Sequence, residues 1–292
     1  MLEKYRSFAV KLVGWVSDKY PDIIKPVEST LPKSGIGIPP KNYVSAVVLT
    51  TLISYIISSI VFPLLVLTVL KLNIFLTILS IVFIPFLVAI MIFVVGMFYP
   101  YQLVLSRKKS IETNLPFAIS HMGSIASSGI PPQAVFKLLS EFKEYDVLAE
   151  EMQKITRNIE VFGLDPMTAL REVAKRTPSD RFKQLLQGLT TTMEGGGDMK
   201  TYLKNAGEQS LFTWRMKRQK YLEQLSTYAE FYTGILIASP LFLISLFSIM
   251  NMIQPQLGGF EISQLMKISV YLIIPALNLG FLLFLHMTQV EM

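Results

Sequence analysis

The chain has 292 residues, of which 51% are hydrophobic and 16% are charged, and its mean hydropathy is +0.47. Soluble domains carry about a quarter charged residues, so this composition favours a membrane protein over a soluble enzyme. The chain has no cysteine, which excludes disulfides, thiolate metal sites and cysteine nucleophiles.

The N-terminal 40 residues are predicted to form one helix and a connector. Over residues 1–20, apolar side chains recur at steps of three and four, as in an amphipathic helix. They are Leu2, Tyr5, Ala9, Leu12, Val16 and Tyr20. This helix would lie either in the headgroup region of a bilayer or against the protein's own body. Residues 21–40 are rich in proline and glycine, and we expect an irregular connector there.

Four long stretches contain no Asp, Glu, Lys or Arg: residues 42–70, 72–106, 231–260 and 268–290. Each exceeds the roughly 20 residues that a helix needs to cross a hydrocarbon core about 30 Å thick. We expect four transmembrane helices, at about 43–70, 74–98, 231–253 and 266–287. The short turn at 71–73 and the loop at 254–264 would join them into two hairpins.

Each predicted transmembrane helix contains one proline: Pro63, Pro85, Pro240 and Pro275. Proline removes a helical hydrogen bond and kinks a helix. Such kinks would make the membrane part compliant. Alternatively, these prolines reflect only the higher frequency of proline in membrane helices.

The central segment has the composition of a soluble domain, with 18 Lys/Arg and 14 Asp/Glu in residues 101–228. Its caps and first-turn prolines predict helices throughout. Helix starts are indicated at Asn114 with Pro116, Pro131-Pro132, Asp146, Asp165-Pro166, Thr177-Pro178 and Asp198. We expect the last of these helices to continue into the third transmembrane helix.

An internal repeat organises these helices. Gly129, Gly163 and Gly196 lie 34 and 33 residues apart, with apolar residues seven and ten positions after each. We therefore expect three helical hairpins, each a helix, a glycine turn and a second helix, packed as a compact antiparallel bundle.

The predicted fold class is all-α: a polytopic membrane protein with four transmembrane helices and a cytoplasmic antiparallel bundle of three helical hairpins. The predicted parts are an N-terminal helix and linker (1–42), a first transmembrane hairpin (43–99), the bundle (100–228) and a second transmembrane hairpin (229–292).

No catalytic, cofactor-binding or metal-binding constellation is expected. The run from Glu194 to Lys200 contains three glycines but lacks the GxxxxGK[ST] spacing of a phosphate loop, so a turn is the simpler interpretation. A cation shared by Glu194 and Asp198 is a minor alternative. His121 and His286 lie in different regions, and neither has a second ligand at metal spacing.

The predicted membrane helices also lack the charged residues that transporters and pumps place in the bilayer. We therefore expect a role through contacts with partners, and two basic sets are the candidates. The first flanks the membrane: Arg107, Lys108, Lys109, Arg215, Lys217, Arg218 and Lys220. The second surrounds the corner at 177–178: Arg171, Lys175, Arg176, Arg181 and Lys183.

The flanking set is interpreted as orientation determinants and lipid headgroup contacts. The second set is either a solvated helix face or a docking face for an acidic partner. Since cationic segments stay on the cytoplasmic side, the N-terminus, the bundle and the C-terminus are expected in the cytoplasm, in a multi-pass protein of the cell membrane. The same rule accounts for the net charge of +6, and we expect no nucleic-acid partner.

Several short motifs in the central segment resemble the F domain of type II secretion and type IV pilus platform proteins. They are LPFA at 115–118, SGIP at 128–131, GLDP at 163–166, RTPS at 176–179 and EGGGDM at 194–199. The RTPS and GGGD motifs look most like the archaeal branch, which serves archaella and adhesive pili. The order of spans and body is similar to that of Tad-type platform proteins, and the resemblance covers about residues 100–255.

The resemblance implies a non-enzymatic platform at the centre of a filament-assembly machine in the cytoplasmic membrane. Its cytoplasmic helices would engage a hexameric secretion ATPase, and its spans would contact pilin-like subunits. One F domain where many such platforms carry two implies either a homodimer, which we prefer, or a pair of paralogues. The alternative function is a membrane permease or scaffold subunit of an ATP-driven transporter, which should show a polar path through the spans.

Overall fold

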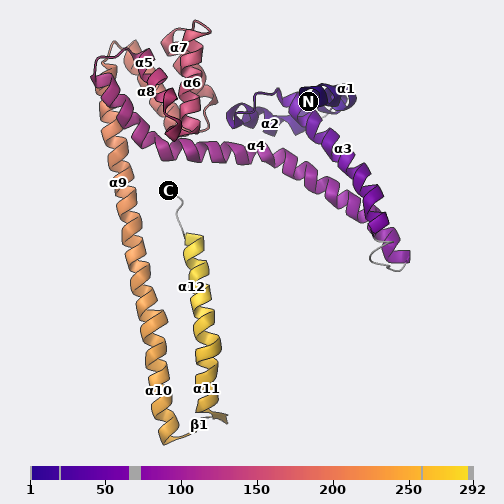
Figure 1. Ribbon diagram of the computed structural model, residues 1–292, viewed down its shortest axis with the longest axis vertical. Coiled ribbons are helices and arrows are strands. Elements are labelled where there is room, and N and C mark those ends of the chain that lie inside the picture. Colours follow the sequence, from indigo (N-terminus) through magenta and orange to yellow (C-terminus); the bar gives the residue numbers. More distant parts are fainter. Residues whose placement is uncertain (1, 20, 66–73, 258, 289–292) are drawn as a thin grey trace. The chain divides into compact units, whose positions relative to one another are not determined.

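The structure is a computed structural model that describes residues 2–19, 21–65, 74–257 and 259–288. It divides into two compact units, Met1–Ser210 and Leu211–Met292. Helices make up almost all of the described residues (Figure 1), and the only strands among them are the two-residue β1 (Gln256–Leu257) and β2 (Phe260–Glu261). The predicted all-α fold class is therefore confirmed.

Four helical segments in the described part of the chain are long and apolar enough to cross a membrane. They are Pro40–Phe62, Phe83–Ser127, Met199–Ile253 and Ile262–Thr288. Two of them, of 45 and 55 residues, are about 65 and 80 Å long at 1.5 Å per residue, well beyond a hydrocarbon core of about 30 Å. Both therefore combine an apolar span with a charged helical extension. The predicted turn at 71–73 lies outside the described residues.

The N-terminal helix α1 (Leu2–Lys19) packs against α3 (Pro40–Leu65) in unit 1. Ala9 and Val13 are buried against Leu49 of α3. One face of this helix thus packs on the protein itself, while Leu12 and Trp15 on the same helix are exposed.

The segment 21–40 contains a second helix, α2 (Pro21–Ser34), so the prediction of an irregular connector is wrong. Burial explains why this helix forms despite Pro26 and Pro32, because it compensates for the two hydrogen bonds that these prolines cannot donate. The buried cluster between α2 and α3 consists of Ile24, Val27, Leu31 and Val44. Only the short turn that begins at Gly35 separates the two helices.

A single helix, α4 (Ile74–Ser127), runs from the second predicted span into the bundle. The prediction that Asn114 and Pro116 start a new helix is wrong. Pro116 removes only its own N–H from the helical ladder. The Asn114 side chain donates from Nδ2 to the carbonyl oxygen of Tyr145 (3.4 Å), so it makes a tertiary contact and caps no helix.

The bundle consists of the C-terminal part of α4, the start of α9 (Met199–Phe231) and the helices between them. These are α5 (Pro132–Glu141), the 3-10 helix η2 (Lys143–Tyr145), α6 (Val147–Glu160), α7 (Pro166–Arg176) and α8 (Asp180–Glu194). The three glycines of the repeat lie in the turns between α4 and α5, α6 and α7, and α8 and α9. Gly129, Gly163 and Gly196 have φ values of 79°, 66° and 68°, a region that favours glycine.

Side-chain caps start three of the bundle helices. Asp165 accepts hydrogen bonds from the backbone N–H groups of Met167 (3.1 Å) and Thr168 (2.9 Å) at the start of α7. Asp198 caps α9 in the same way, as predicted. The cap of α8 is Ser179, whereas Thr177 ends α7, so the prediction that Thr177 caps the next helix is wrong by two residues. Asp165 also accepts a hydrogen bond from the Thr168 hydroxyl, and this bond, with those from the backbone N–H groups of Thr168 and Met167, lowers the pKa of Asp165.

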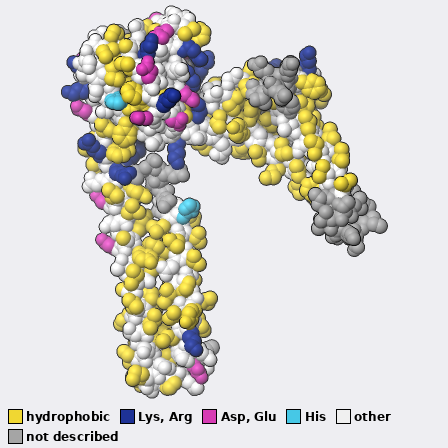
Figure 2. Space-filling view, viewed as in Figure 1, with side chains coloured by type: hydrophobic (Ala, Val, Ile, Leu, Met, Phe, Trp, Pro, Cys, Tyr) yellow, Lys and Arg dark blue, Asp and Glu magenta, His cyan; other side chains and the backbone are white. Residues whose placement is uncertain are grey.

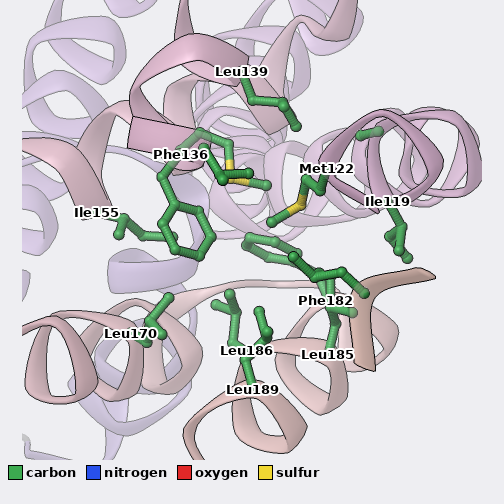
Figure 3. Close-up of a cluster of buried hydrophobic side chains, with 14 of the residues drawn as sticks. Ile119, Met122, Phe136, Leu139, Ile155, Leu170, Phe182, Leu185, Leu186 and Leu189 are labelled. Atoms are coloured by element: carbon green, nitrogen blue, oxygen red, sulfur yellow. The ribbon is translucent and has the colours of Figure 1, made fainter. Parts of the chain in front are cut away.

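The core of the bundle is formed by apolar side chains from α4 to α9. Figure 3 shows several of them converging on one space. Phe136 of α5 and Phe182 of α8 are fully buried there, together with Met122 of α4, Ile155 of α6 and Leu170 of α7. Side chains from α4 to α9 thus pack into one shared core.

Two glycines allow α4 and α9 to cross in backbone contact. A Cβ atom added at Gly123 would lie 3.2 Å from Cα of Lys204, and one added at Gly207 would lie 3.0 Å from Cα of Ser120. Since the obstructing atoms belong to the backbone, they cannot turn away as a flexible side chain could. This crossing joins the two helices that connect the bundle to the apolar spans.

Unit 2 is a helical hairpin. Its first arm is the remainder of α9, the π-helical segment η3 (Tyr232–Ala238) and α10 (Ser239–Ile253); its second is α11 (Ile262–Ile268), the π-helical segment η4 (Ser269–Ile273) and α12 (Ile274–Thr288). Each π-helical segment ends shortly before a predicted kink proline, Pro240 or Pro275. The hydroxyl of Tyr232 donates to Oδ1 of Asn278 (3.4 Å) and links the arms.

We predict that Gly207→Leu destabilises the bundle, because its side chain would overlap the backbone of α4. Overpacking of this kind costs about 1–3 kcal/mol, which thermal unfolding of the purified protein in detergent would detect as a lower midpoint. Gly280→Leu is the matched control, since no atom lies within 4 Å of a Cβ at that position. Equal midpoints for the two variants would contradict the close crossing.

Candidate functional site

Charged side chains gather on the bundle, whereas the α10–α12 hairpin is covered mainly by hydrophobic ones (Figure 2). The two predicted basic sets therefore differ in surroundings. Some members of each set are bound by acidic residues of the bundle itself, and others are exposed. Which members are free to meet a partner follows from these contacts.

Arg107 of α4 forms a buried ion-pair site with α6. Its Nη2 lies 2.9 Å from Oε2 of Glu150 and 3.1 Å from Oε1 of Glu151. The side chain of Glu151 is only 3% exposed, and Lys154 also lies 2.7 Å from its Oε1. The guanidinium of Arg107 also packs against Gly35, in the turn between α2 and α3. Arg107 therefore joins three parts of unit 1.

Lys108 and Glu112 connect the same stretch of α4 to the start of α8. Nζ of Lys108 lies 3.0 Å from Oδ2 of Asp180, and this hydrogen bond lowers the pKa of Asp180. The cap residue Ser179 donates from Oγ to Oε1 of Glu112 (3.3 Å). Adjacent residues of α4 thus bind α6 on one side and α8 on the other.

Further along α4, polar contacts reach η2 and the start of α6. Ser110 donates from Oγ to Oδ2 of Asp146 (2.8 Å). His121 lies 2.8 Å from the hydroxyl of Tyr145, measured from Nδ1, and its ring packs near Phe142 with centroids 5.4 Å apart. Both histidine contacts are within the bundle, so His121 has a packing role.

The second basic set, on α7 and α8, is exposed, but three of its members have acidic neighbours. Arg171 pairs with Glu194. Lys175 (2.9 Å) and Arg176 (3.9 Å) both approach Glu172. The two remaining members, Arg181 and Lys183, form no ion pair within the described ranges.

Of the other members of the flanking set, Lys109 lies on α4 and four lie on α9, at positions 215–220. Arg215, Lys217, Arg218 and Lys220 are all exposed. They precede the charge-free stretch that begins at Phe231. Basic residues in this position, next to a span, are expected to contact lipid headgroups. The sequence alone does not show that Arg107 and Lys108 form ion pairs whereas these four residues are exposed. The acidic partner of Arg107 lies 44 residues away in the chain, and that of Lys108 lies 72 residues away.

Within the described part of the chain, no group of three or more His, Asp or Glu side chains could hold a metal ion. The carboxylates of the glycine turn have other partners: Glu194 pairs with Arg171, and Asp198 caps α9. His286 is exposed near the end of α12. These acidic and histidine side chains are therefore accounted for by ion pairs, a helix cap and exposed positions.

Residues 118–247 match the protein family described as type II secretion system (T2SS), protein F. Flagella accessory protein J of Methanocaldococcus jannaschii is 28% identical over 209 residues, which cover 71% of this chain and 35% of that protein. Flagella accessory protein J of Methanococcus voltae is 25% identical over 177 residues, which cover 60% of this chain and 30% of that protein.

A second Methanocaldococcus jannaschii protein, uncharacterized protein MJ1286, is 25% identical over 194 residues, 65% of this chain and 33% of that protein. The chain thus spans about a third of the length of the curated relatives it matches. No solved structure matches it.

We predict that Arg107→Ala lowers the free energy of unfolding by on the order of 3 kcal/mol, since Glu151 would keep a buried charge with only Lys154 beside it. Denaturant unfolding followed by circular dichroism measures the change. Lys217→Ala, at an exposed site on α9, is the control and should change it by no more than about 0.5 kcal/mol. The double variant Arg107→Met/Glu151→Met should recover most of the loss, and an unchanged stability of Arg107→Ala would refute the role of the pair.

Proposed function

Since the chain carries a type II secretion system protein F domain, we propose that it is the membrane platform of a type IV pilus-like assembly machine, of the archaellum, archaeal pilus or Tad type. In this role it couples a cytoplasmic secretion ATPase to the insertion of pilin-like subunits into a filament. The observation that carries the proposal is the family match over residues 118–247, in a chain with four helices able to span a membrane. The names of the two flagella accessory relatives support the archaellum branch.

The bundle is the part that we assign to the ATPase. Its exposed basic set on α7 and α8 offers positive charge to an acidic partner surface, and such complementarity steers association. Arg181 and Lys183 are the strongest members, because neither forms an ion pair within the described ranges. Arg171, Lys175 and Arg176 already have acidic neighbours and would contribute less.

The route from this surface to the membrane runs through helices. Asp180 follows Ser179 at the start of α8, and both contact α4 through Lys108 and Glu112. Movement imposed on α8 would therefore act directly on α4, which continues without a break into an apolar span. The backbone contact at Gly123 and Gly207 would pass the same movement to α9.

The apolar spans are the parts that we assign to pilin-like subunits. Their charge-free surfaces suit contact with other apolar helices and give no sign of an ion path. The proposal places both termini and the bundle in the cytoplasm, because the basic residues flank that side of the spans. It includes a homodimer or a pair of paralogues as the working assembly.

We predict that Arg181→Glu/Lys183→Glu reduces co-purification of the secretion ATPase from native membranes by at least about tenfold, since two like charges would now face the acidic surface. Lys200→Glu/Lys204→Glu, with the same change in net charge at exposed positions on α9, is the control and should retain the ATPase. Quantitative immunoblotting of the eluate gives the ratio. Undiminished recovery with the first variant would remove this docking face from the proposal, and failure of the wild-type chain to recover any ATPase would refute the function.

A further inference from the structure

An open cleft of about 940 Å³ lies in unit 1, between the turn that joins α2 to α3 and the helices α6 and α7. Gly35 to Pro40 form one wall. The polar residues of the other wall come from α6 and α7, and three of them are cations. They are Glu151, Lys154, Arg157, Asn158, Glu172 and Arg176. A volume of this size can hold a small organic ligand.

The two carboxylates of the cleft are neutralised by cations from outside it. Glu151 is bound by Arg107 (3.1 Å) as well as by Lys154. Glu172 is bound by Lys175 (2.9 Å), which lowers its pKa, and it lies 3.9 Å from Arg176. Neither Arg107 nor Lys175 lines the cleft, so the cleft keeps an excess of positive charge.

The donors left over belong chiefly to two arginines and one amide. Arg157 forms no ion pair, and the Asn158 side chain no hydrogen bond, with any residue in the described ranges. The side chain of Arg176 is 72% exposed and has only the long contact to Glu172. Guanidinium groups present paired N–H donors that match a phosphate in geometry, and such bonds are among the stronger ones in proteins.

The remaining lining of the cleft is apolar and adjoins a membrane span. Ile36 and Ile38 lie in the turn, and Phe162 of the opposite wall is 63% exposed. The turn ends at Pro40, where the first candidate span begins. A ligand in this cleft would therefore lie at the level of the lipid headgroups, with apolar side chains available for its hydrocarbon part.

We propose that the cleft binds the phosphate of an anionic phospholipid headgroup. Arg157 and Arg176 hold the phosphate, and Ile36, Ile38 and Phe162 contact the glycerol and the first acyl carbons. A free phosphate compound offers the same anion but would leave the apolar wall unused. This site goes beyond the assembly function and does not depend on the ATPase.

The test is native mass spectrometry of the full chain in detergent micelles, titrated with phosphatidylglycerol, phosphatidylcholine or inorganic phosphate. We expect phosphatidylglycerol to bind more tightly than phosphatidylcholine, and Arg157→Gln/Arg176→Gln to weaken it by at least about tenfold, as loss of charge-assisted hydrogen bonds predicts. Lys200→Gln/Lys204→Gln removes two exposed cations outside the cleft and should bind phosphatidylglycerol like the wild type.

Equal affinity of the wild type and the cleft variant for phosphatidylglycerol would overturn the site. Inorganic phosphate that displaces the lipid at equal concentration would overturn the assignment to lipid in favour of a soluble phosphate. The single variant Arg157→Gln repeats the measurement without altering the contacts of Glu172. It should also weaken binding of phosphatidylglycerol, and an unchanged affinity would count against the site.

Discussion

The buried ion pair between Arg107 and Glu151 constrains how α4 and α6 meet in unit 1. Taking a carboxylate and a guanidinium out of water is costly, and the cost is offset only when the two groups meet in good geometry. The pair therefore permits one placement of α6 against α4 and penalises others. Because the same guanidinium packs against Gly35, the turn before the first span is held in that arrangement as well.

Two continuous helical segments run from the bundle into apolar spans. The helical segments Phe83–Ser127 and Met199–Ile253 each contain an apolar span and a charged extension, and α4 and α9 meet in backbone contact at Gly123 and Gly207. The π-helical segments before Pro240 and Pro275 are the places where the spans of unit 2 depart from regular geometry, and such segments frequently mark functional sites.

The sequence allowed much of this fold to be predicted, because its signals were local. Charge-free stretches predicted the four candidate spans. Asp165 and Asp198 predicted helix starts, because their side chains cap the helices that follow them. The predictions that were wrong concern features that depend on tertiary contacts or on the continuity of a helix. The helix α2 forms despite its prolines because one of its faces is buried. The helix α4 continues through Pro116 because the hydrogen bonds on either side of this proline remain. The sequence places Arg107 beside a span but does not show its ion pairs, because the acidic partners come from α6, far along the chain. The cleft of Arg157 and Arg176 was missed for the same reason.

The proposed function requires a bundle that faces the cytoplasm, and cysteine labelling in intact cells tests this requirement most directly. The chain has no cysteine of its own, so a single cysteine at exposed Gln184 of α8, or at Gln254 in the loop between α10 and α11, reports one position at a time. The account predicts that a membrane-impermeant maleimide labels Gln254→Cys in intact cells and Gln184→Cys only after the membrane is opened. Labelling of Gln184→Cys in intact cells, with Gln254→Cys protected, would contradict it.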